Sequence, residues 1–392
     1  MKRITLLSMT LLLGLSSASV AQNKNDIYVF EDVKRLPVTS MKSQDRAGTC
    51  WSWSALSFFE SEVIRLGKDS VSLAPLYVVW NTYNGKADKF VRMHGHSNFS
   101  QGGAFTDVTW AIRNFGIVPL EVYKGLNYGE TVHVHGEVDA ILKGYVDAVV
   151  KNPNKKLSTA WKRGYEAVLN AYFGEKPESF TWKGKEYTPQ TFASEACGLN
   201  MDDYVSITSY THHPFYSKFA VEVPDNWLWG LSYNLPMEEM MEVMDNAIDN
   251  GYSIAWASDI SEAGFSRDGY AIVPEENVVE MSDAEISKWL DMPKEEQKAA
   301  KKPGQEKTIT QEMRQIAFDN YQSTDDHGMQ IMGKAKDKLG NDYFIVKNSW
   351  GEYNKYKGYF YASYPFVAYK TTSLIVHKDA IPKTIKKKMG IK

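Results

Sequence analysis

A cysteine at the predicted start of a buried helix is the feature that most constrains this chain. After Cys50, apolar residues recur at steps of three and four (Leu56, Phe59, Val63), which predicts a helix that ends at Gly67. A thiol at a helix N-terminus lies near unpaired backbone N–H groups and the positive end of the helix dipole, and both stabilise a thiolate. We therefore expect Cys50 to be a reactive nucleophile whose pKa lies below that of an ordinary thiol.

A glutamine in front of this cysteine adds a second part of such a site. Gln44 precedes Cys50 by six residues, so its side-chain amide can reach back over the start of the helix. Together with the backbone N–H of Cys50, that amide can hold the negatively charged oxygen of a tetrahedral intermediate. The segment therefore predicts the front half of a cysteine peptidase site.

A base and a residue that orients it are predicted near the C-terminus. His327 begins one predicted strand, and Asn348 ends another that starts near residue 343. If these strands are neighbours, the Asn348 side-chain carbonyl accepts a hydrogen bond from one imidazole nitrogen and leaves the other facing Cys50. Trp350 would then shield this hydrogen bond from water.

Two carboxylates, Asp325 and Asp326, directly precede the predicted base. We expect one of them to support the imidazolium of His327 and to raise its pKa, because a nearby negative charge favours the protonated ring. We expect the other to be exposed.

The chain resembles the papain-type cysteine peptidases, and more closely their bleomycin hydrolase and aminopeptidase C branch. The resemblance rests on four motifs in chain order: Gln44, Cys50-Trp51, His327 and Asn348-Ser349-Trp350-Gly351. The resemblance runs from about residue 37 to residue 392. It implies an α+β fold with a helical lobe, a β-rich lobe and large insertions. It also implies hydrolysis from the peptide N-terminus and a homohexamer whose sites face an inner cavity, without a metal or a cofactor.

Two further segments are assigned to substrate binding. The paired glycines Gly102 and Gly103 would let a peptide approach the backbone closely and pair with it as a strand does, although a plain turn is the alternative. The last residues, 387–392, resemble the bleomycin hydrolase arm, which implies that the terminal carboxylate of Lys392 faces the substrate amino group. A disordered basic tail is the alternative for this segment.

The N-terminus has the features of an export signal. Lys2 and Arg3 precede an apolar stretch at 4–15 that is too short to span a bilayer, and small residues at 19–21 form a cleavage site. We expect cleavage after residue 21 and a periplasmic or secreted protein without a membrane span; an uncleaved anchor is the alternative. The mature chain, 22–392, is expected to be one peptidase domain with a helical lobe (37–124), an insertion (125–225), a β-rich lobe (237–379) and a C-terminal arm (380–392).

Local patterns predict the other elements. Helices are expected at 73–80, 108–115, 138–150, 160–173 and 237–250, a hairpin at 181–187, strands at 252–257, 358–364 and 374–377, and a solvated excursion at 282–308.

Other kinds of site receive less support. The histidine pairs at 94 and 96, 133 and 135, and 212 and 213 come without cysteines or carboxylates at a metal-ligand spacing, so we interpret them as exposed loop residues. The formal net charge of −3 gives no indication of nucleic-acid binding. A disulfide between Cys50 and Cys197 is the alternative to a free thiol, but we expect Cys197 to be a buried apolar residue.

The sequence therefore predicts a cysteine-type aminopeptidase that acts on peptides. Two alternatives stay open: an endopeptidase or dipeptidyl peptidase on the same scaffold, and a catalytically silent protein that binds peptides.

Overall fold

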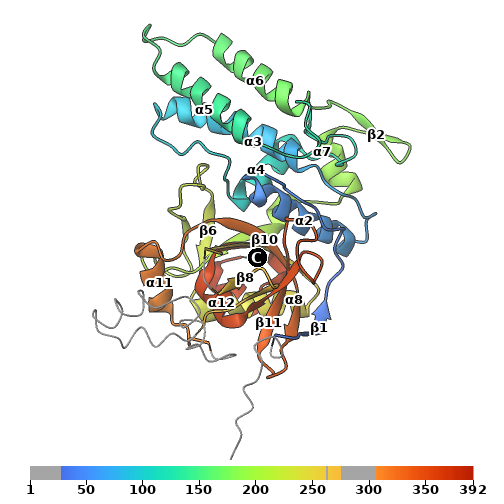
Figure 1. The fold of residues 1–392 in the computed structure, drawn as a ribbon, viewed down its shortest axis with the longest axis vertical. Coiled ribbons are helices and arrows are strands. Elements are labelled where there is room, and N and C mark those ends of the chain that lie inside the picture. The colour runs from blue at the N-terminus through green and yellow to red at the C-terminus, as the bar shows by residue number, and fades with distance from the viewer. Residues whose placement is uncertain (1–27, 262–263, 275–305, 392) are drawn as a thin grey trace, which may run out of the picture.

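A helical lobe and a lobe built around one large sheet make up the computed structural model (Figure 1). The structure describes residues 28–261, 264–274 and 306–391. The predicted signal peptide and most of the predicted excursion at 282–308 lie outside these residues. The combination of helices and a mixed sheet confirms the predicted α+β class. No helix in the described ranges combines the length and the apolar character needed to cross a bilayer.

The helical lobe is arranged around α2, whose side chains are buried on nearly every side. The lobe consists of α2 (Cys50–Arg65), α3 (Pro75–Arg92), α4 (Phe105–Phe115), α5 (Gly136–Val150), α6 (Ala160–Phe173), α7 (Pro189–Thr191) and the hairpin of β2 (Phe180–Trp182) and β3 (Lys185–Tyr187). These elements confirm the predicted helices and hairpin. However, α3 continues past its predicted end, because Tyr83, Ala87 and Phe90 extend its apolar stripe at helical spacing.

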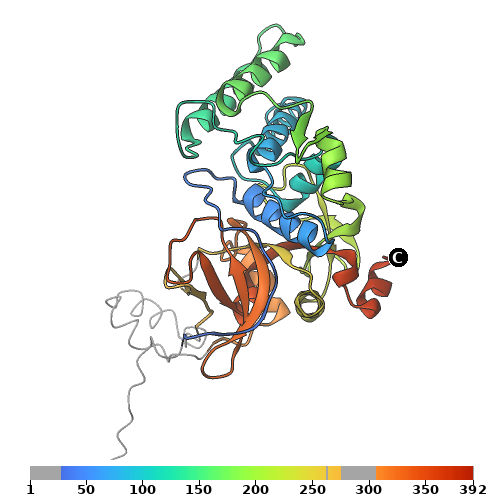
Figure 2. The ribbon, with the colours of Figure 1, turned by 90° about the vertical axis from the view of Figure 1, so that its right-hand side faces the viewer.

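The second lobe is a mostly antiparallel sheet with the strand order β5-β6-β4-β13-β7-β10-β11-β12-β9-β8, in which β1 also pairs with β10. Its strands are β1 (Glu31–Arg35), β4 (Tyr204–Thr208), β5 (Lys218–Ala220), β6 (Leu231–Asn234), β7 (Ile254–Ser258), β8 (Phe265–Ser266), β9 (Tyr270–Ala271), β10 (His327–Lys336), β11 (Asp342–Lys347), β12 (Tyr359–Ser363) and β13 (Thr371–His377). The stretch expected as an insertion divides between the lobes, because α5 and α6 join the helices whereas β4 and β5 join the sheet (Figure 2).

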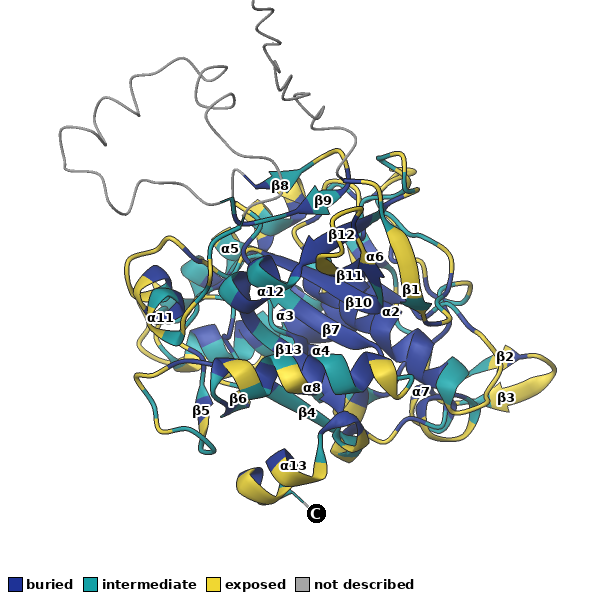
Figure 3. Cartoon of the chain, turned by 90° about the horizontal axis from the view of Figure 1, so that it is seen from below, coloured by how far each residue is buried: buried dark blue, intermediate teal, exposed yellow. Residues whose placement is uncertain are grey.

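The two faces of this sheet have different surroundings. On one face, Trp256 and Leu374 pack with Met240 of α8 (Met237–Asp249) in a continuous apolar core. The next residues along the same strands, Ala257 and Ser373, line a cleft on the opposite face, as the alternation of side chains in a strand requires. The remaining helices are α11 (Gln311–Asp319), α12 (Tyr364–Lys370) and α13 (Lys383–Met389). Figure 3 shows α8 lying across the buried strands.

The junction between the lobes is polar although it is buried. On α2, Ser57 donates to the Gln330 side chain of β10 at 2.7 Å, and Lys347 at the end of β11 donates to Ser57 at 2.8 Å. Glu60, one turn further along α2, pairs with Lys42 and is fully buried. Burying such groups is favourable only when they are hydrogen-bonded, so these contacts fix the position of α2 on the sheet.

Candidate active site

Cys50 is the first residue of α2 and lies in the cleft between the two lobes. This cleft has a volume of about 580 Å³. The site residues that line it are Gln44, Cys50, Gly102, Gly103, His327 and Trp350. As the first helical residue, Cys50 has a backbone N–H without an intrahelical acceptor. Its side chain is half-buried and forms no disulfide, and Cys197 is free and fully buried.

His327 and Asn348 meet at the edge of the cleft, although 21 residues separate them. His327 begins β10 and Asn348 follows β11, and these strands are antiparallel neighbours. The Nε2 atom of His327 lies 2.8 Å from Oδ1 of Asn348. Because an amide oxygen only accepts, Nε2 carries the hydrogen and Nδ1 is left with the lone pair of a base. The Trp350 ring lies 4.7 Å from the imidazole, centroid to centroid, and covers it.

Gln44 is fixed by hydrogen bonds on both sides of its amide. Its Oε1 accepts from the Ser349 hydroxyl at 2.6 Å, and its Nε2 donates to the Ala47 carbonyl at 2.7 Å. An amide nitrogen has two hydrogens, so one donor remains after the contact with Ala47. Gln44 therefore combines a fixed position in the cleft with a donor available for a substrate oxygen.

The glycine after His327 is required by the close approach of β10 to α2. The backbone N–H of Gly328 donates to the thiol of Cys50. A Cβ at this position would lie 2.7 Å from the Ser54 hydroxyl and 3.1 Å from the Phe105 ring. A larger residue would therefore push the strand away from the cysteine.

The glycine pair in the cleft is just as tightly enclosed. A Cβ on Gly103 would lie 2.8 Å from the Trp51 ring, and one on Gly102 would lie 1.9 Å from a carboxylate oxygen of Asp225. Trp51 also donates to the carbonyl of Gln101 at 3.0 Å, which holds the segment against α2. Asp225 was not among the predicted site residues, although it lines the cleft.

The expected decrease in the thiol pKa is wrong for this structure. Burial raises the pKa of Cys50 to about 12, and the negative charge of Asp325 adds to this effect. Burial also lowers the pKa of His327 to about 4, although the hydrogen bond that its ring donates to Asn348 opposes this shift. Burial therefore disfavours the charged form of each group taken alone. A thiolate and an imidazolium formed together would attract each other, which opposes this penalty.

Of the two aspartates, one lies as predicted and one does not act as predicted. Asp325 does not raise the pKa of His327; its own pKa is raised to about 7, chiefly by burial. Asp326 is exposed, as predicted, and its two oxygens accept from the backbone N–H of Ile260 at 2.9 Å and from the Ser261 hydroxyl. Both carboxylates line the cleft beside the base.

The described part of the C-terminal arm lies outside the cleft, contrary to prediction. Ile385 and Met389 of α13 are buried in the core that contains α8, on the sheet face opposite the cleft (Figure 3). Lys388 pairs with Glu239 of α8 at 2.6 Å. We expected the terminal carboxylate of Lys392 to face the substrate amino group, but Lys392 lies outside the described residues. The apolar spacing of α13 explains its position, because residues four apart share one helix face.

We expect Met389→Ala to lower the free energy of unfolding by about 2 kcal/mol, because it truncates a buried side chain. The products formed from a peptide should not change. Urea denaturation and product sequencing measure the two effects, and Lys387→Ala, an exposed neighbour on the same helix, should stay within about 0.5 kcal/mol of the wild type. If a folded Met389→Ala protein gave different products, this result would contradict the position of the arm outside the cleft.

The histidine pairs do not all lie in exposed loops, as we had predicted. His133 and His135 are buried, and burial lowers the pKa of His135 to about 4. His94 and His96 are exposed, as predicted.

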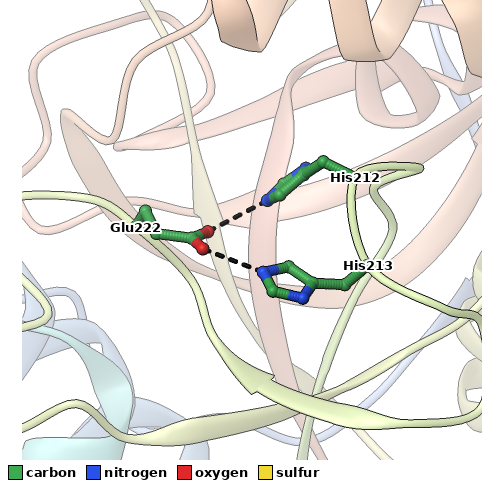
Figure 4. A group of neighbouring side chains, drawn as sticks. All are labelled: His212, His213 and Glu222. Carbon is green, nitrogen blue, oxygen red and sulfur yellow. Dashed lines mark hydrogen bonds and ion pairs between the residues drawn. The ribbon is translucent and has the colours of Figure 1, made fainter.

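His212 and His213 both face the carboxylate of Glu222, at 3.0 and 2.9 Å (Figure 4). These three side chains could hold a metal ion. They form two hydrogen bonds that join neighbouring loops.

A nucleophile at a helix N-terminus, a base with its amide partner and a cleft between a helical and a sheet lobe together define a papain-like cysteine peptidase. The comparisons with known proteins agree with this class. Residues 84–391 match the Peptidase C1-like family, and the chain belongs to that family. Gln44 and Cys50 precede the matched stretch.

Individual relatives extend the similarity over most of the chain. Aminopeptidase C of Lactobacillus delbrueckii subsp. lactis is 23% identical, over 89% of this chain and 81% of its own. Aminopeptidase G of the same subspecies is 22% identical, over 89% of this chain and 83% of its own. The crystal structure of PepW from Lactobacillus rhamnosis HN001 superimposes with a TM-score of 0.69 at 19% identity, covering 92% of this chain and 84% of that one. This superposition supports the fold.

Proposed function

We propose that this protein is an aminopeptidase that removes residues from the free N-termini of peptides. The observation that carries the proposal is that Cys50 and His327 line one cleft from opposite lobes, with Asn348 hydrogen-bonded to His327. The names of the aminopeptidase relatives support the N-terminal mode of cleavage. The complete set of groups argues against a silent peptide-binding protein.

The chemistry follows from the positions of these groups. Cys50 attacks the peptide carbonyl as His327 takes its proton, and His327 then returns a proton to the leaving amine. Asn348 holds the ring so that Nδ1 is the base. The free donor of Gln44 and the backbone N–H of Cys50 stabilise the negative oxygen of the tetrahedral intermediate. Gly102 and Gly103 offer backbone groups to an extended substrate.

The packing of α13 against α8 favours a second candidate function, because it leaves the described part of the C-terminal arm outside the cleft. If no C-terminal carboxylate marks the end of the cleft, an endopeptidase or a dipeptidyl peptidase could use the same catalytic groups. Sequencing the products of one defined peptide decides between these modes. An aminopeptidase releases single residues from the free peptide and leaves its N-acetylated form intact, whereas internal cleavage of both forms would contradict the proposal.

A further inference from the structure

Asp225 lines the cleft beside the glycine pair. It lies in the loop 221–230, which connects the antiparallel strands β5 and β6. Its carboxylate is in direct contact with the backbone of Gly102, since a Cβ there would lie within 2.5 Å of both carboxylate oxygens and of Cγ. A longer peptide that paired with Gly102 and continued in the same direction would collide with this side chain.

The loop that carries Asp225 is held from several directions. Within it, the Asn226 side chain donates to the Val221 carbonyl at 3.0 Å and accepts from the Gly230 N–H at 2.8 Å. The Trp227 indole donates to Asp107 of α4 at 2.7 Å. Near its start, Glu222 bridges the two histidines shown in Figure 4. Such contacts position a binding group before the substrate arrives, which lowers the entropic cost of binding.

One oxygen of the Asp225 carboxylate remains available. Oδ1 accepts from the Asn98 amide at 3.0 Å and more weakly from the Ser100 hydroxyl at 3.4 Å. Oδ2 accepts no hydrogen bond from any residue in the described ranges. The nearby cation Lys86 is buried and donates to the carbonyls of Ser100 and Gly102. Its charge opposes the rise that burial causes in the pKa of Asp225.

Asp225 also lies close enough to the nucleophile to affect it. Its negative charge contributes to the raised pKa of the Cys50 thiol. Of the other carboxylates that line the cleft, Asp326 already accepts hydrogen bonds at both oxygens. Asp325 accepts from the Thr372 hydroxyl at 3.1 Å, and burial raises its pKa. Of these three carboxylates, Asp225 is the one in contact with the glycine pair, beside which an extended substrate would lie.

We propose that Asp225 binds the α-ammonium group of the substrate through Oδ2 and blocks the cleft beyond it. The proposal rests on the proposed aminopeptidase function and names the group that enforces it. A charge-assisted hydrogen bond of this kind is stronger than a neutral one and is screened less in a partly buried site. The same side chain attracts a free amine and collides with any peptide that extends further.

The charge and the volume of this side chain can be tested separately. Asp225→Asn keeps the shape but removes the charge, and we expect kcat/KM for a free peptide to fall by about 10- to 100-fold. Hydrolysis of the N-acetylated peptide should stay at the wild-type level. Asp225→Ala removes the volume as well, and it should begin to cut the acetylated peptide internally. Asp202→Asn, at an exposed carboxylate outside the cleft, is the matched control and should behave as the wild type.

Two outcomes would overturn the proposal for proteins whose thermal unfolding matches the wild type. These are an unchanged free-peptide kcat/KM in Asp225→Asn and no internal cleavage by Asp225→Ala. The wild-type protein tests the aminopeptidase function separately, because that function fails if the unmodified enzyme does not require a free amino group.

Discussion

Replacing Cys50 with alanine should abolish peptide hydrolysis and leave the fold intact. The sulfur is the atom that forms the covalent intermediate, so removing it should lower kcat/KM by at least about 10⁴-fold. Assays with one defined peptide measure the loss, and thermal unfolding shows whether the variant is folded. Stability should change little because Cys50 is only half-buried.

The second cysteine provides the control for this experiment. Cys197 is fully buried in the apolar core of the helical lobe and does not line the cleft, so a peptide carbonyl cannot reach its sulfur. Cys197→Ala should keep most of the activity while lowering stability by about 1 kcal/mol. Turnover by a purified Cys50→Ala protein would remove the proposed mechanism.

The second large effect is expected at His327. His327→Ala removes the general base and should lower kcat by about 10³-fold, because positioned proton transfer contributes an effect of this size. Asn348→Ala should cause a smaller loss, in kcat rather than in KM, because its contact with the ring matters most as the imidazolium forms. Steady-state kinetics on one peptide compare the two variants.

The ranking of these two variants is the informative result. Asn348 acts through His327, so its removal cannot cost more than removal of the base if the roles are as assigned. An equal or larger loss from a folded Asn348→Ala protein would mean that Asn348 contacts the substrate or that another group is the base.

The catalytic groups were predictable from sequence because their chemistry requires particular residue types. The apolar spacing after Cys50 predicted α2, and short apolar stretches placed His327 and Asn348 at the ends of two strands. The pairing of those strands followed from the need to bring base and amide together. Both the local apolar spacing and the residue types that the reaction requires can be read from one sequence.

The features that sequence missed depend on contacts between distant segments. Asp225 meets Gly102 only because the β5–β6 loop folds over the cleft. The pKa shifts of Cys50 and His327 are caused chiefly by burial. The extent of this burial could not be predicted from the position of Cys50 at a helix start. In the arm, Ile385 and Met389 lie four residues apart and share one buried helix face, whereas the resemblance implied that the arm lies in the cleft.

The polar junction between α2 and the sheet has a consequence for how the protein unfolds. Moving the lobes apart would leave the buried charges of Lys347 and Glu60 without the partners that compensate for lost hydration. Opening along this plane is therefore costly, and the two lobes are coupled into one cooperative unit. The nucleophile belongs to one lobe and the base to the other, so the polar junction that couples the lobes also keeps these two groups in position relative to each other.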